Sequence, residues 1–399
     1  MIESAKTHCG SLLEGNAASS ESNQRIRRHN FACAAVAWHP GVRRGIARNS
    51  VVRAFRAEVE MLFRAKYSFA VIALVCSLLL PMTQAAPSPS ELLAAGRVDD
   101  LIASLQTKIR STPSDAPSYN YLCRAYFALG EWDRAISACE KSISLRPETS
   151  EYHLWLGRAY GEKADRVNPF SAASLAGKVR REFERAVQLD PKSVEARTDL
   201  AEFYLDAPGI IGGGQDKARA QAHELAQLSP EKAHYILGRI AEKNKDQVAA
   251  EKEYRDAIDA SQGQALEWFN LALFYRHNSR YDEMEKTLQR ATKAPSPNEV
   301  LVESAEILIR AGRNLPWAEK LIRHYLASDP PSEKAPLFKA HFVLGNSLEK
   351  QGDKEGAAQE YRAALSLARS FSPAQQALNR VSKNRVGQQR EDGNGGAGR

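Results

Sequence analysis

Three histidines are the residues in this sequence that most resemble a set of metal ligands: His153, His234 and His341. Imidazole nitrogens bind zinc, but a zinc site needs three or four ligands around one ion. The histidines occupy the same position of a repeated sequence pattern, and Trp268 occupies that position in another copy. They lie at least two copies of that pattern apart, so they cannot reach one ion. We interpret them as packing residues and predict no metal site.

A run of three glycines at 212–214, followed by Lys217, could be taken for a phosphate-binding loop. Such a loop follows a strand, and a Ser or Thr follows its lysine. Here Ala218 follows the lysine and no strand pattern precedes the glycines. We therefore interpret the run as a tight turn that starts the next helix. The sequence also lacks HExxH, GxSxG and CxxC motifs, so we predict no cofactor and no enzymatic activity. An enzyme with an unrecognised site is the alternative.

The elements that would position any binding site come from a pattern that returns about every 34 residues. Each copy has a large residue, an apolar residue three positions on, a small residue next to it, and a large residue three positions further. The copies are Tyr119, Leu122, Cys123 and Tyr126; His153, Leu156, Gly157 and Tyr160; Arg197, Leu200, Ala201 and Tyr204; His234, Leu237, Gly238 and Ala241; Trp268, Leu271, Ala272 and Tyr275; a weaker set of Leu301, Ala305 and Leu308; and His341, Leu344, Gly345 and Leu348.

This spacing places the apolar residues of each copy on one face of a helix. A second signature, Ala-x3-large-x2-small, follows most copies, as in Ala357, Tyr361 and Ala364. Gly352 marks a turn between the two segments, and prolines such as Pro191 end the second one. Each copy is thus a helical hairpin that must stack on its neighbours to bury both faces.

The pattern resembles the tetratricopeptide repeat, whose W-x2-L-G-x2-Y…A-x3-F…P form and 34-residue length it matches. The resemblance implies an all-α fold, a right-handed α-solenoid of about seven helix-turn-helix repeats over residues 116–371. We expect an N-terminal half repeat at 90–115, a C-terminal capping helix at 373–384, and a disordered tail at 385–399.

Two neighbouring copies are longer than the period. The second carries ten extra residues around 165–174, and the third carries five extra within 207–214. Both additions fall between the two helices of a hairpin. In a stacked array such turns lie along one edge, so we expect the two insertions to be adjacent in space.

The first helices of such repeats line a concave groove, so residues offset from the packing face become candidates for binding a partner. Exposed aromatics and arginines are typical interface anchors, although some of these rings could simply pack between repeats. The predicted groove residues are Tyr121, Arg124, Trp155, Arg158, Tyr235, Arg239, Phe269, Asn270, Phe342 and Asn346, with Asp199, Glu202, Leu273, Glu303 and Glu306 beside them.

Charge alternates along this predicted groove, which suits an extended polypeptide better than a uniform polyanion. We therefore predict a scaffold or assembly factor that binds a protein or peptide. A ligand- or carbohydrate-associated module using the insertions at 165–174 and 207–214 is the alternative.

The composition of the 399 residues agrees with a protein-binding role and argues against nucleic acid. Hydrophobic residues make up 43% and charged residues 26%, an ordinary globular balance that excludes a disordered chain or a multi-span membrane protein. Most of the net charge of +7 lies in the N-terminal part of the chain: residues 1–60 carry +4 and residues 61–85 carry +2. The remainder carries only +1, without the basic stripe that nucleic acid needs.

Residues 61–85 have the layout of a secretory signal peptide. Arg64 and Lys66 precede an almost purely apolar run over 67–80, and small residues follow it. We predict cleavage between Ala85 and Ala86 and export to the periplasm or the extracellular space. Membrane contact is expected only through this segment, if it stays uncleaved. Residues 1–60 are interpreted as sequence translated from too early a start codon, or as a disordered cytosolic arm on an uncleaved anchor.

Cys123 and Cys139 are the cysteines of the predicted mature chain. Both occupy positions that face the interior of one hairpin, and an oxidising compartment would favour a bridge. Packed helix axes stand about 8–10 Å apart, however, and a disulfide needs Cα atoms within about 7 Å. We therefore expect two buried thiols that act as small hydrophobic side chains.

Overall fold

The structure is a computed structural model that describes residues 86–295, 298–328 and 331–394. The predicted leader at 1–60 and the signal peptide at 61–85, including Ala85, lie outside the described residues. Throughout the described part, the regular elements are helical. They are α2 (Pro89–Ala94), α3 (Val98–Ser111), α4 (Ala116–Leu129), α5 (Trp132–Leu145), α6 (Ser150–Ala164), α7 (Pro169–Leu189), α8 (Val194–Asp206), η1 (Gly209–Ile211), α9 (Gln215–Leu228), α10 (Pro230–Lys243), α11 (Gln247–Ala260), α12 (Ala265–His277), α13 (Tyr281–Ala291), α14 (Asn298–Ala311), α15 (Leu315–Leu326), α16 (Leu337–Lys350), α17 (Lys354–Leu367) and α18 (Ser372–Asn394).

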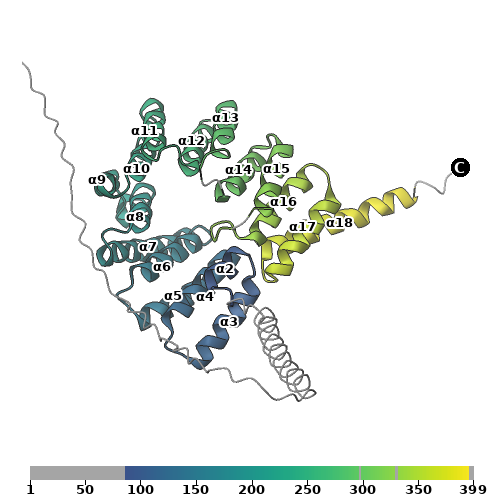
Figure 1. Cartoon of the computed structure of the whole chain (residues 1–399), viewed down its shortest axis with the longest axis horizontal. Helices are drawn as coiled ribbons and strands as arrows, with labels where there is room; N and C mark the ends of the chain where they lie inside the picture. The colour runs from purple at the N-terminus through teal and green to yellow at the C-terminus, as the bar shows by residue number, and fades with distance from the viewer. Residues whose placement is uncertain (1–85, 296–297, 329–330, 395–399) are drawn as a thin grey trace, which may run out of the picture. The chain divides into compact units, whose positions relative to one another are not determined.

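The helices from α4 to α17 form seven consecutive hairpins, each packed against the next, as Figure 1 shows. The predicted all-α solenoid of about seven repeats is therefore confirmed. Helices α2 and α3 occupy the segment predicted as an N-terminal half repeat, and α18 follows the last hairpin.

Small residues in the first helix of a hairpin allow the second helix to approach closely. Gly345 lies directly beneath the ring of Tyr361: a Cβ on the glycine would come within 2.5 Å of that ring. Tyr361 is fully buried and donates its hydroxyl hydrogen bond to Glu349 at 2.7 Å. The glycine and tyrosine of the two sequence signatures are thus one packing contact, which explains why they recur together.

The apolar core runs along the whole array between first and second helices. One of its clusters joins residues from both ends of residues 86–394: Leu92 and Val98 pack in the same cluster as Phe338 and Phe371. Gly96, in the turn between α2 and α3, has a positive φ of 71°, and a Cβ there would lie 2.6 Å from the backbone nitrogen of Phe338. The half repeat is therefore docked onto the last hairpin.

Polar contacts hold this docking. The carboxylate of Glu333, between α15 and α16, accepts hydrogen bonds from Ser90 and Arg124. Asp99 of α3 accepts from the backbone N–H and the Nε of Arg369, at 3.1 and 2.9 Å. We call these five residues the clasp. Because of the clasp, the curved array meets itself, and α2 and α3 lie beside α16 and α17 in Figure 1.

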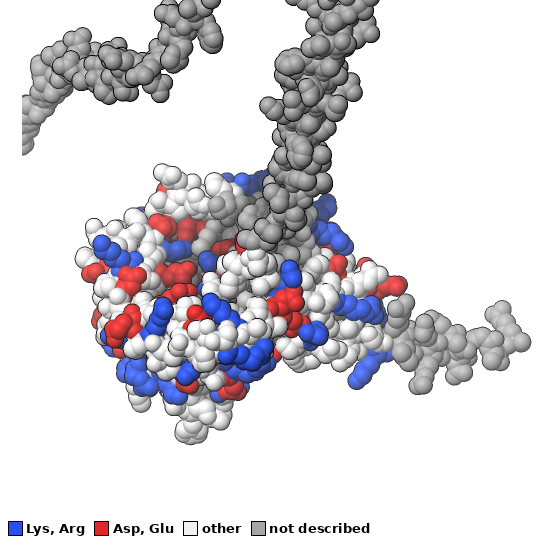
Figure 2. All heavy atoms as spheres, turned by 60° about the horizontal axis from the view of Figure 1, so that its bottom comes forward, with Lys and Arg blue, Asp and Glu red and all other residues white. Residues whose placement is uncertain are grey.

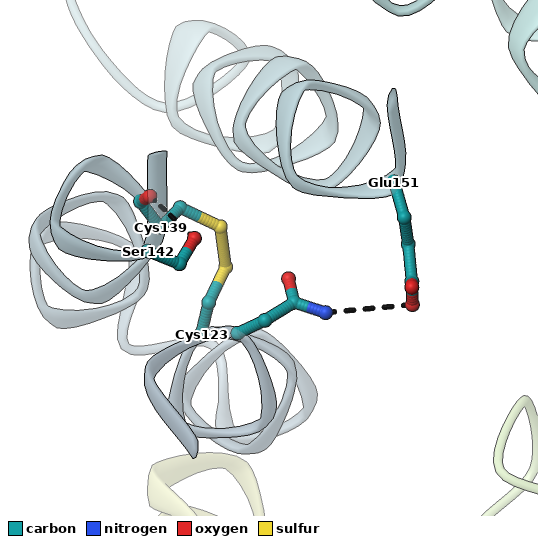
Figure 3. The surroundings of a disulfide bond; sticks show 5 residues. Cys123, Cys139, Ser142 and Glu151 are labelled. Carbon is teal, nitrogen blue, oxygen red and sulfur yellow. Dashed lines mark hydrogen bonds between the residues drawn. A yellow bond between two sulfur atoms is a disulfide. The ribbon is translucent and has the colours of Figure 1, made fainter. Parts of the chain in front are cut away.

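The expectation of two free thiols is wrong, because Cys123 of α4 and Cys139 of α5 form a disulfide (Figure 3). Their Cα atoms are 5.2 Å apart. Cα atoms lie about 2.3 Å off a helix axis, so two that face each other stand about 3.4–5.4 Å apart when the axes are about 8–10 Å apart. The separation of the axes therefore does not prevent a bridge. Both cysteines are fully buried, as expected.

The C-terminal helix is longer than the sequence suggests. We expect a capping helix at 373–384 and a disordered tail from 385, whereas α18 continues to Asn394. Residues 385–394 contain Gln, Arg and Glu, which favour helix. Glycine dominates the composition only beyond that point.

A search of the described helices finds none that is both long enough and apolar enough to cross a membrane.

Candidate functional site

The first helices of the hairpins form the inner face of the array. Successive first helices contact one another, from α4 with α6 through to α14 with α16. A curved stack brings the elements of its inside closest together, so these helices carry the concave surface. On the face shown in Figure 2, acidic and basic side chains are interspersed around a hollow.

Trp155 of α6 lies between two guanidinium groups on this inner face. Arg124 and Arg158 stand 5.1 and 5.0 Å from its ring centre, close enough for cation–π attraction. The rings of Trp155 and Phe127 are nearly perpendicular, with centres 5.4 Å apart. Tyr121 lies under Arg124 at 4.7 Å. The structure therefore brings four predicted groove residues into one partly exposed aromatic and cationic group.

The charges of the inner face pair from one hairpin to the next. Arg124 contacts Glu151 at 3.3 Å, and the Nε of Arg158 donates to Asp199 at 2.6 Å. Arg239 contacts Asp206 at 3.1 Å, and Tyr235 donates to Glu202 at 2.6 Å. The alternation of charge along the sequence is thus largely a ladder of ion pairs between neighbouring hairpins. A partner would meet paired charges along most of this ladder.

Four further predicted groove residues have different environments. Phe269 and Asn270 of α12 are buried, with 8% and 9% exposure, so placing them on the groove surface is wrong. Both lie where α12 packs against its neighbours, and Asn270 donates to the buried Glu267 at 2.9 Å. Phe342 is partly buried against Phe371. The side-chain oxygen of Asn346 lies 2.9 Å from the Tyr361 hydroxyl, beside the closer acceptor Glu349.

Glu303 of α14 is an inner-face carboxylate whose hydrogen bonding is incomplete. Its Oε2 atom is buried without a hydrogen-bond partner. Burial, followed by repulsion from Glu299 and Glu306, raises the pKa of Glu303 to about 7. The two neighbouring glutamates are paired, Glu299 with Lys334 and Glu306 with Arg310.

The two insertions meet, as the sequence predicts. The first lengthens the turn before α7 and the start of that helix, and the second forms η1 and the glycine turn after it. Arg180 of α7 donates to the carbonyl oxygen of Ile211 at 3.0 Å. A pocket of about 490 Å³ lies between α6, α7 and α8, and residues of both insertions, Asp165 and Pro208 among them, line it. The sequence shows where the insertions lie, but the pocket depends on side chains of three helices.

Each of the three histidines pairs with a glutamate on the second helix of its own hairpin. His153 contacts Glu182, and the other two make the equivalent contact with Glu253 and Glu360, all at 2.7–2.8 Å. The three histidines therefore lie in three different hairpins, each beside its own glutamate. His234, Glu253 and Asp256 have donor atoms within 4.8 Å of one another, which makes them a group of the described residues that could hold an ion.

Parts of the chain match models of a known repeat family. Models of the tetratricopeptide repeat match residues 116–149, 213–265, 268–297 and 338–371. The chain contains tetratricopeptide repeats. The hairpin α6–α7 and helix α8 lie outside these matches. The first insertion extends into α7, and the second follows α8.

A curated relative is similar over part of its length. The cytochrome c-type biogenesis protein CycH of Bradyrhizobium diazoefficiens is 27% identical over 139 residues, which are 34% of this chain and 34% of that protein. The alignment thus spans about a third of the relative.

Several solved structures resemble the chain at low identity. A thermophilic tetratricopeptide-repeat protein of Thermus thermophilus is 15% identical with a TM-score of 0.38, covering 45% of this chain and 91% of that one. Yeast Tom70 is 15% identical with a TM-score of 0.47, covering 73% and 59%. MamA is 18% identical with a TM-score of 0.34, covering 41% and 89%.

Proposed function

We propose that this protein is an exported scaffold or assembly factor that binds a polypeptide on the inner face of its tetratricopeptide repeats, without catalysis of its own. The aromatic and cationic group around Trp155 carries the proposal, because partly exposed tryptophan and arginine side chains are the commonest energetic anchors of protein interfaces. The similarity to a cytochrome c-type biogenesis protein supports a role in assembly.

Two observations support export. The segment 61–85 has the layout of a signal peptide. The Cys123–Cys139 disulfide lies in the part of the chain that would be exported, and stable disulfides belong mainly to oxidising compartments.

Site-specific photo-cross-linking tests the binding proposal. A photoreactive phenylalanine analogue would replace Tyr121 on the inner face and, as the control, Val248, which is 84% exposed on the second helix α11. We expect one defined protein to be attached in intact cells from position 121 and not from position 248. Trp155→Ala should abolish that product. Identical products from both positions would contradict a binding site on the inner face.

The site of processing is tested separately. We predict that the protein purified from its native cells begins at Ala86, because a signal peptidase reads the small residues before that position. Mass spectrometry of the intact protein and of its N-terminal peptide measures this directly. Peptides from residues 1–60 in the purified material would contradict it.

A further inference from the structure

The pocket between α6, α7 and α8 has an apolar floor. Val179 and Phe183 of α7 are buried beneath it, whereas Phe127 and Phe203 are partly exposed on its sides. A volume of about 490 Å³ is ample for one long side chain together with some of its backbone. The floor therefore favours a segment that brings aliphatic or aromatic surface into the pocket.

The upper wall of the same pocket is acidic. Its lining contains five carboxylates and one guanidinium, that of Arg158. Asp199 is paired with Arg158 at 2.6 Å, and Glu162 is paired with Arg166 at 2.9 Å. Asp165, at the start of the first insertion, is exposed and makes no side-chain hydrogen bond or ion pair within the described part of the chain. The wall thus presents at least one carboxylate that is free to take a cation.

The remaining acids of the wall are crowded. Burial raises the pKa of Asp199, and it also raises the pKa of Glu202, with the charges of Asp199 and Asp206 adding to the effect. These two carboxylates already have partners, Asp199 in Arg158 and Glu202 in Tyr235. The exposed carboxylate of Asp165 is therefore the one on this wall that is available to a cation from a partner.

We propose that this pocket receives a lysine or arginine side chain of the polypeptide partner, a proposal that rests on the function proposed above. The aliphatic stem lies on Phe127 and Phe203, and the charged head reaches the carboxylates of Asp165 and Glu162. A basic side chain combines an apolar stem with a cationic end, and aromatic faces attract that end as well. A purely apolar side chain would match only the apolar floor. An acidic side chain would match neither the floor nor the acidic wall.

Selection from a phage-displayed library of random 12-residue peptides on the purified protein tests this preference. We expect the recovered peptides to share one position rich in lysine or arginine. A synthetic peptide with that arginine replaced by citrulline keeps the size and loses the charge, and it should bind about tenfold more weakly. Fluorescence anisotropy of the labelled peptides gives both affinities.

Matched variants assign the preference to the pocket. Glu162→Gln with Asp165→Asn should make the arginine and citrulline peptides bind equally, whereas the exposed Asp259→Asn should leave the tenfold difference intact. Gly161→Leu fills the pocket from α6, where an added Cβ would meet only Val179 at 4.0 Å. Gly177→Leu makes the same change on α7, in open space outside the pocket lining. Only the first leucine should block binding.

Two failures can be told apart. Peptides that bind without any basic preference, or that ignore both the charge variants and Gly161→Leu, would overturn the pocket assignment and leave the scaffold proposal standing. Recovery of no peptide above background would contradict the scaffold proposal itself, and the pocket assignment with it.

Discussion

Single residues on the inner face differ in whether their charged groups have a partner. Arg158 and Asp199 pair with each other between neighbouring hairpins, whereas Glu303 has a buried oxygen with no hydrogen-bond partner. A buried carboxylate without a partner favours its protonated form. The stability of the protein should therefore depend on pH through Glu303 in particular.

We predict that Glu303→Gln stabilises the protein at pH 8 and not at pH 5. The pKa of Glu303 is raised to about 7 in the folded state by burial and by Glu299 and Glu306. The folded protein therefore binds the proton more tightly than the unfolded chain, and this contribution to stability is lost as the pH rises through 7. The gain at pH 8 should be about 2 kcal/mol.

Urea unfolding at the two pH values measures this gain, with the exposed Asp259→Asn as the control. A gain of the same size at pH 5 would mean that the charge of Glu303 is not its cause.

The disulfide leads to a second prediction about individual residues. Replacing Cys123 and Cys139 together by alanine should lower the free energy of unfolding by about 3 kcal/mol, the value for a closed loop of this length. The bridge spans 16 residues of sequence. Urea unfolding of the double variant measures the loss, and adding reductant to the unmodified protein should reproduce it. Alkylation of both cysteines in unfolded, unreduced protein would contradict the bridge.

Pairs of helices pack through a large side chain of the second helix over a small residue of the first, as Tyr361 does over Gly345. The half repeat departs from this scheme. Helix α2 has only six residues. Helix α3 packs mainly against α4, and the turn at Gly96 meets Phe338 of the last hairpin. The close approach of that turn makes the docking sensitive to one methyl group.

We predict that Gly96→Ala destabilises the protein by at least about 1 kcal/mol more than Gly352→Ala. Both glycines have positive φ, at 71° and 89°, so both substitutions carry the backbone cost of a left-handed residue. Only at Gly96 would the added methyl group also strike backbone, 2.6 Å from the nitrogen of Phe338, while nothing lies within 4 Å at Gly352. Thermal unfolding of the two variants gives the difference, and equal losses would contradict the docked arrangement.

Over the whole of residues 86–394, the decisive feature is that the two ends of the repeat array meet. An open array can widen or narrow its concave face, because each repeat contacts only its neighbours. Contacts between the first and last hairpins remove that freedom. The clasp therefore sets the width of the inner face that a partner would enter, and its central residue is Glu333, which binds both Ser90 and Arg124.

We predict that Glu333→Ala loosens the half repeat while leaving the middle of the array intact. Hydrogen–deuterium exchange should become faster over 89–111 and stay unchanged over 230–291, because only the former loses a contact. Lys334→Ala is the matched control: its side chain is 62% exposed and pairs with Glu299 rather than with the half repeat. Unchanged exchange over 89–111 in the Glu333 variant would contradict the role of Glu333, and would show that the apolar contacts and the Asp99–Arg369 pair hold the ends together without it.

The sequence by itself determined the hairpins, their number and the adjacency of the two insertions. These features depend on the spacing of apolar and small residues within about 34 positions, and a helix period makes that spacing visible. The tertiary structure decided the rest. It alone shows that Cys123 faces Cys139 closely enough for a bridge, that Phe269 is buried, and that Arg158 is paired with Asp199. It also decided that Glu333 joins the two ends of the array. Such contacts depend on the angle and distance between elements far apart in the chain, which accumulate over many repeats and which no local spacing encodes.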